Sequence, residues 1–136
     1  MKLIPSNINE NSPLGEKRIF QILKSTDKNS MNDWIVYHSL NYPVKIEKEN
    51  KISYIYFGET DFLVFIPKKG LINIEIKGGR ISSSNGEWFT ENRSGISKLK
   101  KSPFVQAKDS LKNIEKFLET KGIRIPQAFL DRKSVV

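Results

Sequence analysis

The sequence predicts one α/β domain, in which a mixed β-sheet built on a central hairpin is flanked by helices. Two segments, residues 12–24 and 102–121, begin with Ser-Pro and carry apolar residues at helical spacing. Between them, two β-prone apolar runs are joined by a short Pro- and Gly-containing turn at residues 67–70. The 136 residues, 38% of them hydrophobic, suffice for one core and are few for two domains.

The first predicted helix begins with Ser12 as capping residue and Pro13 at the first helical position, and it ends near Lys24. Glu16 lies on the same stripe as its apolar residues. Such a carboxylate either stays solvated near the positive end of the helix dipole or faces inward for a functional reason.

Two strands are predicted next, at residues 34–38 and 52–57, with a polar turn over residues 45–51 between them. His38 is the one histidine and the chain has no cysteine, which excludes multi-His and Cys-type metal sites within one chain. We expect His38 to be a strand residue with a satisfied ring rather than a catalytic group.

The hairpin turn decides which side chains lie together. A three-residue loop with Gly70 in the left-handed position predicts Leu63 opposite Glu75 and Asp61 opposite Lys77, all on one face. Glu75 and Lys77 share a face in any register, because residues i and i+2 of a strand point the same way. The side on which Asp61 lies depends on the loop length.

Asp61, Glu75 and Lys77 would therefore converge at the end of an apolar hairpin. As a surface ion pair they would contribute only about 0–1 kcal/mol. Buried, these charges would cost several kcal/mol unless paired or bound to metal. Two carboxylates on adjacent strands offer the oxygen ligands that Mg²⁺ prefers, and hydrated Mg²⁺ beside an ammonium group can hydrolyse a phosphodiester.

The second half predicts a small hairpin around Asn85-Gly86, with Trp88 packed rather than stacked on a base, and a second helix that ends before Gly122 and packs against the sheet. The acid-free segment 93–101 reads as a loop. It either is solvated or contributes to a basic rim that contacts nucleic-acid phosphates. The rim would comprise Arg80, Arg93, Lys98, Lys100 and Lys101.

Overall charge indicates the class of partner. Lys and Arg number 23 against 15 Asp and Glu, a formal net charge of +8, which favours a polyanion such as DNA or RNA. The N-terminus lacks the apolar region of a signal peptide, and no apolar run approaches the roughly 20 residues of a membrane span. We expect a cytoplasmic protein that does not enter membranes.

The last six residues can be back-translated into codons that resemble a sequencing adapter (GATCGGAAGAGCGTCGTG). We therefore expect residues 131–136 to be a non-native tail, with residues 1–11 as an N-terminal extension and 12–130 as the domain. The native gene would then continue beyond Leu130, and the domain would be incomplete at its C-terminal end.

A family resemblance rests on motifs in a fixed order. Asp61 followed by Glu75-Ile76-Lys77 resembles the Asp…(Asp/Glu)-x-Lys signature of restriction-endonuclease-like nucleases. Over about residues 12–120 the chain is similar to the nuclease-related domain, although Phe62 stands where His is frequent. The matching features are Gly15-Glu16, Trp34-x-Val36-x-His38, Glu59-Thr60-Asp61-Phe62, Gly70-Leu71-x-x-Ile74-Glu75-x-Lys77-Gly78-Gly79, Trp88 and Pro103-Phe104-x-Gln106-Ala107.

The resemblance implies a restriction-endonuclease-like core that cleaves DNA with Mg²⁺ or Mn²⁺. Asp61 and Glu75 would hold the metal, with Glu16 as a further ligand, and Lys77 would position or activate the attacking water. Gln106 would lie near the phosphate-attracting N–H groups of the second helix, or would merely cap or hydrate that helix.

The family also suggests partners and alternatives. Such domains often adjoin helicase or kinase-like modules, and none is visible in this chain. One alternative is a noncatalytic nucleic-acid-binding module that retains the fold. Another is an interaction domain in which the acidic cluster is structural.

Overall fold

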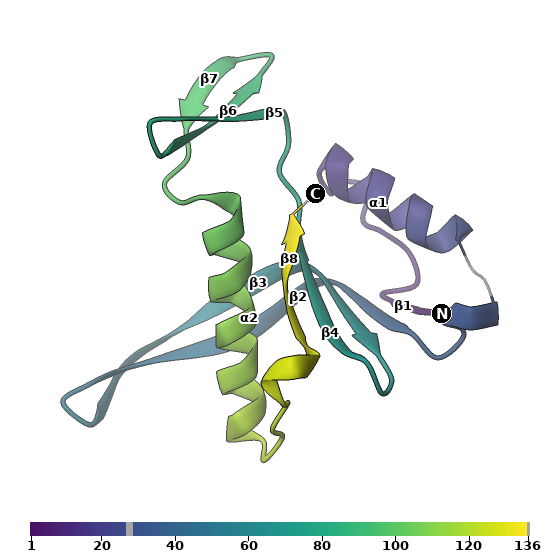
Figure 1. The fold of residues 1–136 in the computed structure, drawn as a ribbon, viewed down its shortest axis with the longest axis vertical. Helices are drawn as coiled ribbons and strands as arrows, with labels where there is room; N and C mark the ends of the chain where they lie inside the picture. Colours follow the sequence, from purple (N-terminus) through teal and green to yellow (C-terminus); the bar gives the residue numbers. More distant parts are fainter. Residues whose placement is uncertain (27–28, 136) are drawn as a thin grey trace.

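A computed structural model describes residues 1–26 and 29–135. Within them, α1 (Leu14–Ser25) and α2 (Pro103–Thr120) lie on opposite faces of a five-stranded mixed sheet with strand order β1-β2-β3-β4-β8 (Figure 1). A three-stranded antiparallel sheet, β5-β6-β7, stands beside the start of α2. The predicted mixed α/β class is confirmed. The strands are β1 (Lys2–Ile4), β2 (Ile35–Lys48), β3 (Lys51–Ile66), β4 (Gly70–Glu75), β5 (Arg80–Ser84), β6 (Glu87–Asn92), β7 (Gly95–Lys98) and β8 (Leu130–Val135), and two 3-10 turns are η1 (Asn29–Met31) and η2 (Gln127–Phe129).

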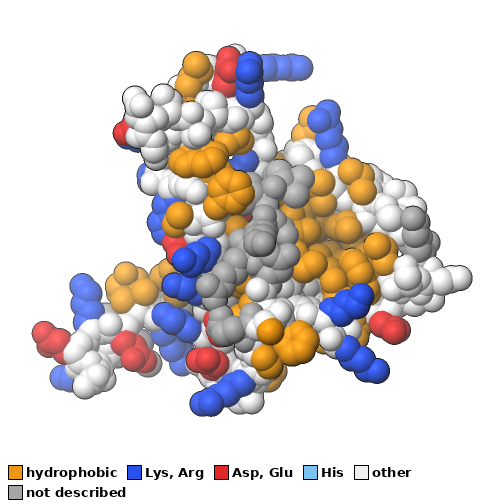
Figure 2. All heavy atoms as spheres, viewed as in Figure 1, with side chains coloured by type: hydrophobic (Ala, Val, Ile, Leu, Met, Phe, Trp, Pro, Cys, Tyr) orange, Lys and Arg blue, Asp and Glu red, His pale blue; other side chains and the backbone are white. Residues whose placement is uncertain are grey.

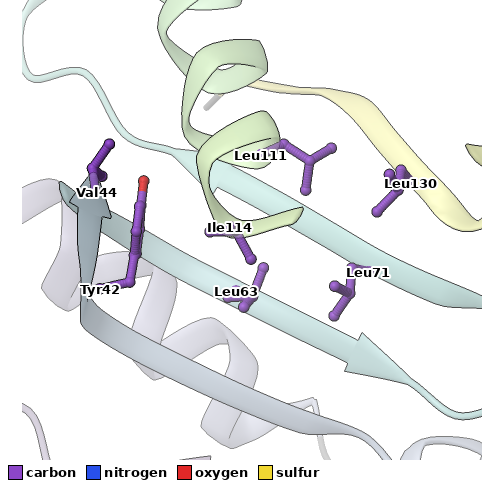
Figure 3. Close-up of a cluster of buried hydrophobic side chains, with 7 residues drawn as sticks. All are labelled: Tyr42, Val44, Leu63, Leu71, Leu111, Ile114 and Leu130. Carbon is purple, nitrogen blue, oxygen red and sulfur yellow. The ribbon is translucent and has the colours of Figure 1, made fainter. Parts of the chain in front are cut away.

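Each face of the larger sheet carries its own core. On the α2 face, Leu111 and Ile114 pack against Leu63, Leu71 and side chains of β2 and β8, as Figure 3 shows. On the α1 face, Phe20 is only 1% exposed and packs with residues of β2 and β3. Burial of such a side chain contributes about 1.5–3 kcal/mol, so the two cores hold both helices on the sheet.

The two Ser-Pro sequences begin their helices differently. Ser102 caps α2, where its hydroxyl accepts a hydrogen bond from the N–H of Val105 at 3.3 Å. The predicted start of α1 is wrong: Pro13 is its N-cap, the helix begins at Leu14, and no side chain caps it. The reason is that Pro13 has ψ of 145°, an extended value outside the helical region.

The β2–β3 hairpin is longer than the sequence predicts. Glu49 and Asn50, both with positive φ, form the turn, so the strands continue through most of the predicted turn over residues 45–51. The outer end of this hairpin extends away from the rest of the domain (Figure 1). Residues 54–57 of β3 are all at least 43% exposed there.

The predicted register of the β3–β4 hairpin is wrong by two residues. Ile66 pairs with Gly70, so residues 67–69 form the loop, and Leu63 lies opposite Asn73 instead of Glu75. Lys68 in the loop has a positive φ of 63°, and Gly70 also has a positive φ, 130°, but it is the first residue of β4 rather than part of the loop. Glycine is needed there both for the positive φ and for space, because a Cβ would lie 2.0 Å from the carbonyl oxygen of Phe129. A shift of two residues preserves the faces.

The small sheet confirms one prediction and corrects another. β5 and β6 form the predicted hairpin around Asn85-Gly86. Trp88 packs edge-on against Phe104 at the start of α2, with ring centroids 5.6 Å apart, as expected for a packed indole. Segment 93–101 is not simply a loop, because residues 95–98 form β7 by pairing with β6.

Both chain ends add parallel edge strands. β1 pairs with β2, and β8 pairs with β4 on the other side of the sheet. Residues 131–135 therefore belong to a strand, and their non-native origin stays a prediction.

Candidate functional site

Asp61 and Glu75 meet where β3 and β4 separate. Glu75 is the last residue of β4 and is only 4% exposed. Across from it, Oδ2 of Asp61 accepts a hydrogen bond from the N–H of Ile76 at 2.6 Å. Since that amide directly follows Glu75, the bond holds the two carboxylates side by side.

Two donors converge on Glu75. The ammonium group of Lys77 donates to Oε1 at 2.6 Å, and the side-chain amide of Gln106 on α2 donates to the same oxygen. Burial raises the pKa of Glu75 above its usual value; the hydrogen bond from Lys77 opposes the rise and the charge of Asp61 adds to it. Four of the predicted site residues, Asp61, Glu75, Lys77 and Gln106, therefore form one cluster.

A buried polar chain beneath the cluster ties α2 to β4. Asn73, 1% exposed, donates to the carbonyl of Ala107 at 3.0 Å and accepts from the hydroxyl of Thr60. Because Ala107 follows Gln106 on the helix, this chain holds Gln106 within reach of Glu75. Thr60 and Asn73 were missed by the sequence analysis; a polar residue between the apolar positions of β4 was the available signal.

Glu16 lies on the other face of the sheet and faces inward. Its Oε2 lies 2.7 Å from Nε2 of His38, and the two side chains are 12% and 4% exposed. The imidazole packs against the rings of Phe20 and Phe62, with centroids 5.9 and 4.8 Å away. The ring of His38 is satisfied, as expected, but its partner is the carboxylate that the sequence singled out for another reason.

A cleft of about 610 Å³ is lined by one member of each group, Glu16 and Lys77. The start of α1, residues 76–79 after the end of β4, Thr90 of the small sheet and Leu99 line it. Here α1 approaches the segment after β4 closely, since a Cβ on Gly15 would lie 2.9 Å from the Ile76 side chain. Side chains from both faces of the sheet thus reach one cleft.

The fit to a divalent metal rests on the pair of carboxylates. Lys77 and Gln106 share Oε1 of Glu75, and Ile76 uses Oδ2 of Asp61, so the second oxygen of each carboxylate takes none of these bonds. Hard oxygen donors of this kind suit Mg²⁺ or Mn²⁺. In the described part of the chain no three His, Asp or Glu side chains are grouped as ligands of one ion, so the structure does not bring Glu16 into the Asp61–Glu75 pair.

The predicted basic rim is exposed, and two of its members have acidic partners. Lys98 pairs with Glu87 on β6, and Lys101 pairs with Asp109 on α2 at 2.8 Å. Among the described residues no such pair is recorded for the other three, Arg80, Arg93 and Lys100. Figure 2 shows basic side chains spread over the small sheet, the side of α2 and the β2–β3 hairpin rather than in one patch.

Comparison with known proteins bears on the family. No curated protein and no solved structure matches the chain. Neither described helix is long and apolar enough to cross a membrane. The family model of the nuclease-related domain (NERD) matches residues 13–133, which include every residue of the cluster and the cleft. The chain therefore belongs to the nuclease-related domain family.

Proposed function

We propose that this chain is a metal-dependent nuclease domain that hydrolyses DNA phosphodiester bonds, with a restriction-endonuclease-like core, as one module of a longer cytoplasmic protein. The observation that carries the proposal is the buried Glu75, which lies beside Asp61 and is paired with Lys77 in a domain of the nuclease-related family. Placing a second carboxylate beside a buried one is unfavourable, and such arrangements gather at functional sites.

In this proposal Asp61 and Glu75 hold Mg²⁺ or Mn²⁺ through the oxygens that their protein hydrogen bonds leave aside. When bound there, the ion would neutralise phosphate charge and polarise a coordinated water. The hydrogen bond from the N–H of Ile76 orients Asp61, and the one from Gln106 orients Glu75. Preorganised ligands of this kind limit the reorganisation that accompanies substrate binding.

Lys77 has two roles in the proposal. Its ammonium group donates to Glu75, and this hydrogen bond opposes the rise in the pKa of that carboxyl group that burial causes. It also lines the cleft, where a positive charge would attract a phosphate and position the attacking water. Glu16 stands on the same cleft and would assist from α1, as an outer ligand or by holding water.

DNA is the proposed substrate because the chain is strongly basic and carries exposed cations on the small sheet and in the segment that leads into α2. Arg80, Arg93 and Lys100 would contact phosphates first, because Lys98 and Lys101 must exchange an acidic partner for the phosphate. Phosphate contacts position a duplex without reading its sequence.

A noncatalytic DNA-binding module is the second candidate. It is favoured by the distance of Glu16 from the Asp61–Glu75 pair, which leaves two carboxylates together where the family resemblance implies three. A binding module would retain the basic surface and would not need Lys77 beside a buried carboxylate.

Cleavage of linear and circular plasmid DNA by the full-length protein tests the proposal. With Mg²⁺ or Mn²⁺, we expect cleavage by the wild type and by Glu119→Ala, which removes an exposed carboxylate of α2. We expect losses of about 100-fold or more for Glu75→Ala and Lys77→Ala, with circular dichroism to verify folding. DNA binding without cleavage by any metal would favour the binding module.

A further inference from the structure

The side chains of Glu16 and His38 form a contact between helix α1 and strand β2. Glu16 is in the first turn of α1. His38 is in β2 and is only 6% exposed. The rings of Phe20 and Phe62 pack against the imidazole. With these rings in place, the imidazole cannot turn without disturbing the core on the α1 face.

The contact restricts a side chain that would otherwise be mobile. A glutamate has several rotatable bonds, and one that lines an open cleft samples many rotamers. Here the 2.7 Å contact to Nε2 of His38 holds Oε2 of Glu16, while the rest of its carboxyl group stays at the cleft wall that it shares with Lys77.

The contact also defines the proton position on the ring. A carboxylate only accepts hydrogen bonds, so Nε2 of His38 carries the hydrogen and donates it. The hydroxyl of Ser39 is also near Nε2, at 3.3 Å, and is the weaker partner because it is neutral and farther away. The geometry therefore requires the Nε2–H form of His38.

We propose that His38 is a positioning residue of the candidate active site: by donating Nε2–H to Glu16 it holds that carboxylate in the cleft that Lys77 also lines, where it assists phosphodiester hydrolysis. This inference rests on the proposed nuclease function and adds to it a residue that itself stays out of the cleft. Partners of this outer kind typically contribute 10–100-fold to activity or metal affinity (about one to two orders of magnitude).

A double-mutant cycle tests whether His38 acts through Glu16. We expect Glu16→Ala and His38→Ala each to lower kcat about 10–100-fold, with little change in KM for DNA. The double variant should be no slower than Glu16→Ala alone, because the group that His38 positions is already missing. His38→Gln, whose side-chain amide can donate from a similar place, should recover about tenfold over His38→Ala.

Ser39→Gly is the matched control. It removes the neighbouring hydroxyl, and glycine suits the positive φ of 49° at this position, so kcat should stay at the wild-type value. A urea midpoint for every variant ensures that rates are compared on folded protein.

A second readout does not depend on activity. Because His38 is the one histidine, protein labelled with ¹⁵N-histidine gives a single pair of ring resonances. We expect the Nε2–H pattern in the wild type and in Ser39→Gly, and a mixture of tautomers in Glu16→Ala. Calorimetric titration with Mn²⁺ should show weaker binding for His38→Ala and for Glu16→Ala by the same factor.

The outcomes separate the two proposals. The positioning role is overturned if the wild type is active and the effects of Glu16→Ala and His38→Ala on kcat multiply. It is also overturned if His38→Ala changes only the urea midpoint. In both cases the nuclease proposal stands. The same holds if the ring shows the Nδ1–H form. A folded wild type that cleaves no DNA with any metal overturns both proposals, even if the ring pattern depends on Glu16.

Discussion

Replacing Lys77 with methionine should destabilise the domain in a way that depends on pH. Lys77 donates to Glu75, and their side chains are 20% and 5% exposed. Removing one partner of a fully buried ion pair costs about 3–5 kcal/mol. Lys77 is partly exposed and Gln106 still donates to Glu75 in the variant, so we expect a loss of about 2–3 kcal/mol at pH 8.

The direction of the pH effect follows from the pKa of Glu75. Burial already raises that pKa, so folding favours the protonated form. The resulting stabilisation is complete below the ordinary carboxyl pKa and is lost as the pH rises through the raised pKa. Lys77→Met removes an interaction that lowers the pKa, so its destabilisation should be largest at pH 8 and should shrink as the pH falls toward 4.

Urea unfolding followed by circular dichroism measures the effect. With a slope of about 2 kcal/mol/M, the midpoint of Lys77→Met should fall by about 1–1.5 M at pH 8. Glu75→Gln/Lys77→Met should regain most of this loss, because a neutral amide replaces the uncompensated carboxylate. Lys77→Arg should stay close to the wild type. An equal loss at both pH values, or no recovery in the double variant, would refute the assignment of a buried ion pair.

Four further predictions concern the fold and the metal. Gly70→Ala should cost about 2–4 kcal/mol in urea unfolding, because φ is positive there and the Cβ also meets the Phe129 carbonyl, whereas Gly86→Ala, where φ is positive but the space is open, should cost about 1–2 kcal/mol. Phe20→Ala should cost about 3–5 kcal/mol by thermal unfolding, since it empties the centre of the core beneath α1. Asn73→Ala should lose about 1–3 kcal/mol and reduce cleavage, as α2 loses its bond to β4; full activity in this variant would count against a role for that bond. EDTA should abolish plasmid cleavage and excess Mn²⁺ should restore it; cleavage that persists in EDTA would contradict the metal-dependent proposal.

Local signals predicted much of the architecture. The Ser-Pro sequences and apolar stripes indicated both helices, and Asn85-Gly86 indicated the small hairpin. The convergence of Glu75 with Lys77 followed from strand alternation alone, since a side chain two positions along a strand returns to the same face. These features depend on neighbours within a few residues of each other.

Features that depend on distant parts of the chain were not predictable in this way. The steric requirement for glycine at position 70 comes from the backbone of Phe129, 59 positions later in the sequence, counted from the two residue numbers. Likewise, the segment around Lys98 contains no acid of its own and finds Glu87 only because β6 and β7 pair.

The Glu16–His38 pair shows the same limit in the site. The carboxylate on an apolar stripe signalled that Glu16 was unusual, but nothing in the spacing named His38, 22 residues away on another element, as its partner. Tertiary packing of α1 on the sheet brings the two side chains together.

The contact between Gly70 and Phe129 has an evolutionary consequence. The contact fixes Gly70, the first residue of β4, and Glu75 is the last residue of the same strand. The number of residues between Gly70 and Glu75 must therefore be conserved. One residue inserted between them would turn Glu75 toward α1, because each step along a strand reverses the face. The loop at residues 67–69 lies outside this interval. In relatives of this chain, the loop should therefore vary in length, whereas the number of residues from Gly70 to Glu75 should stay constant.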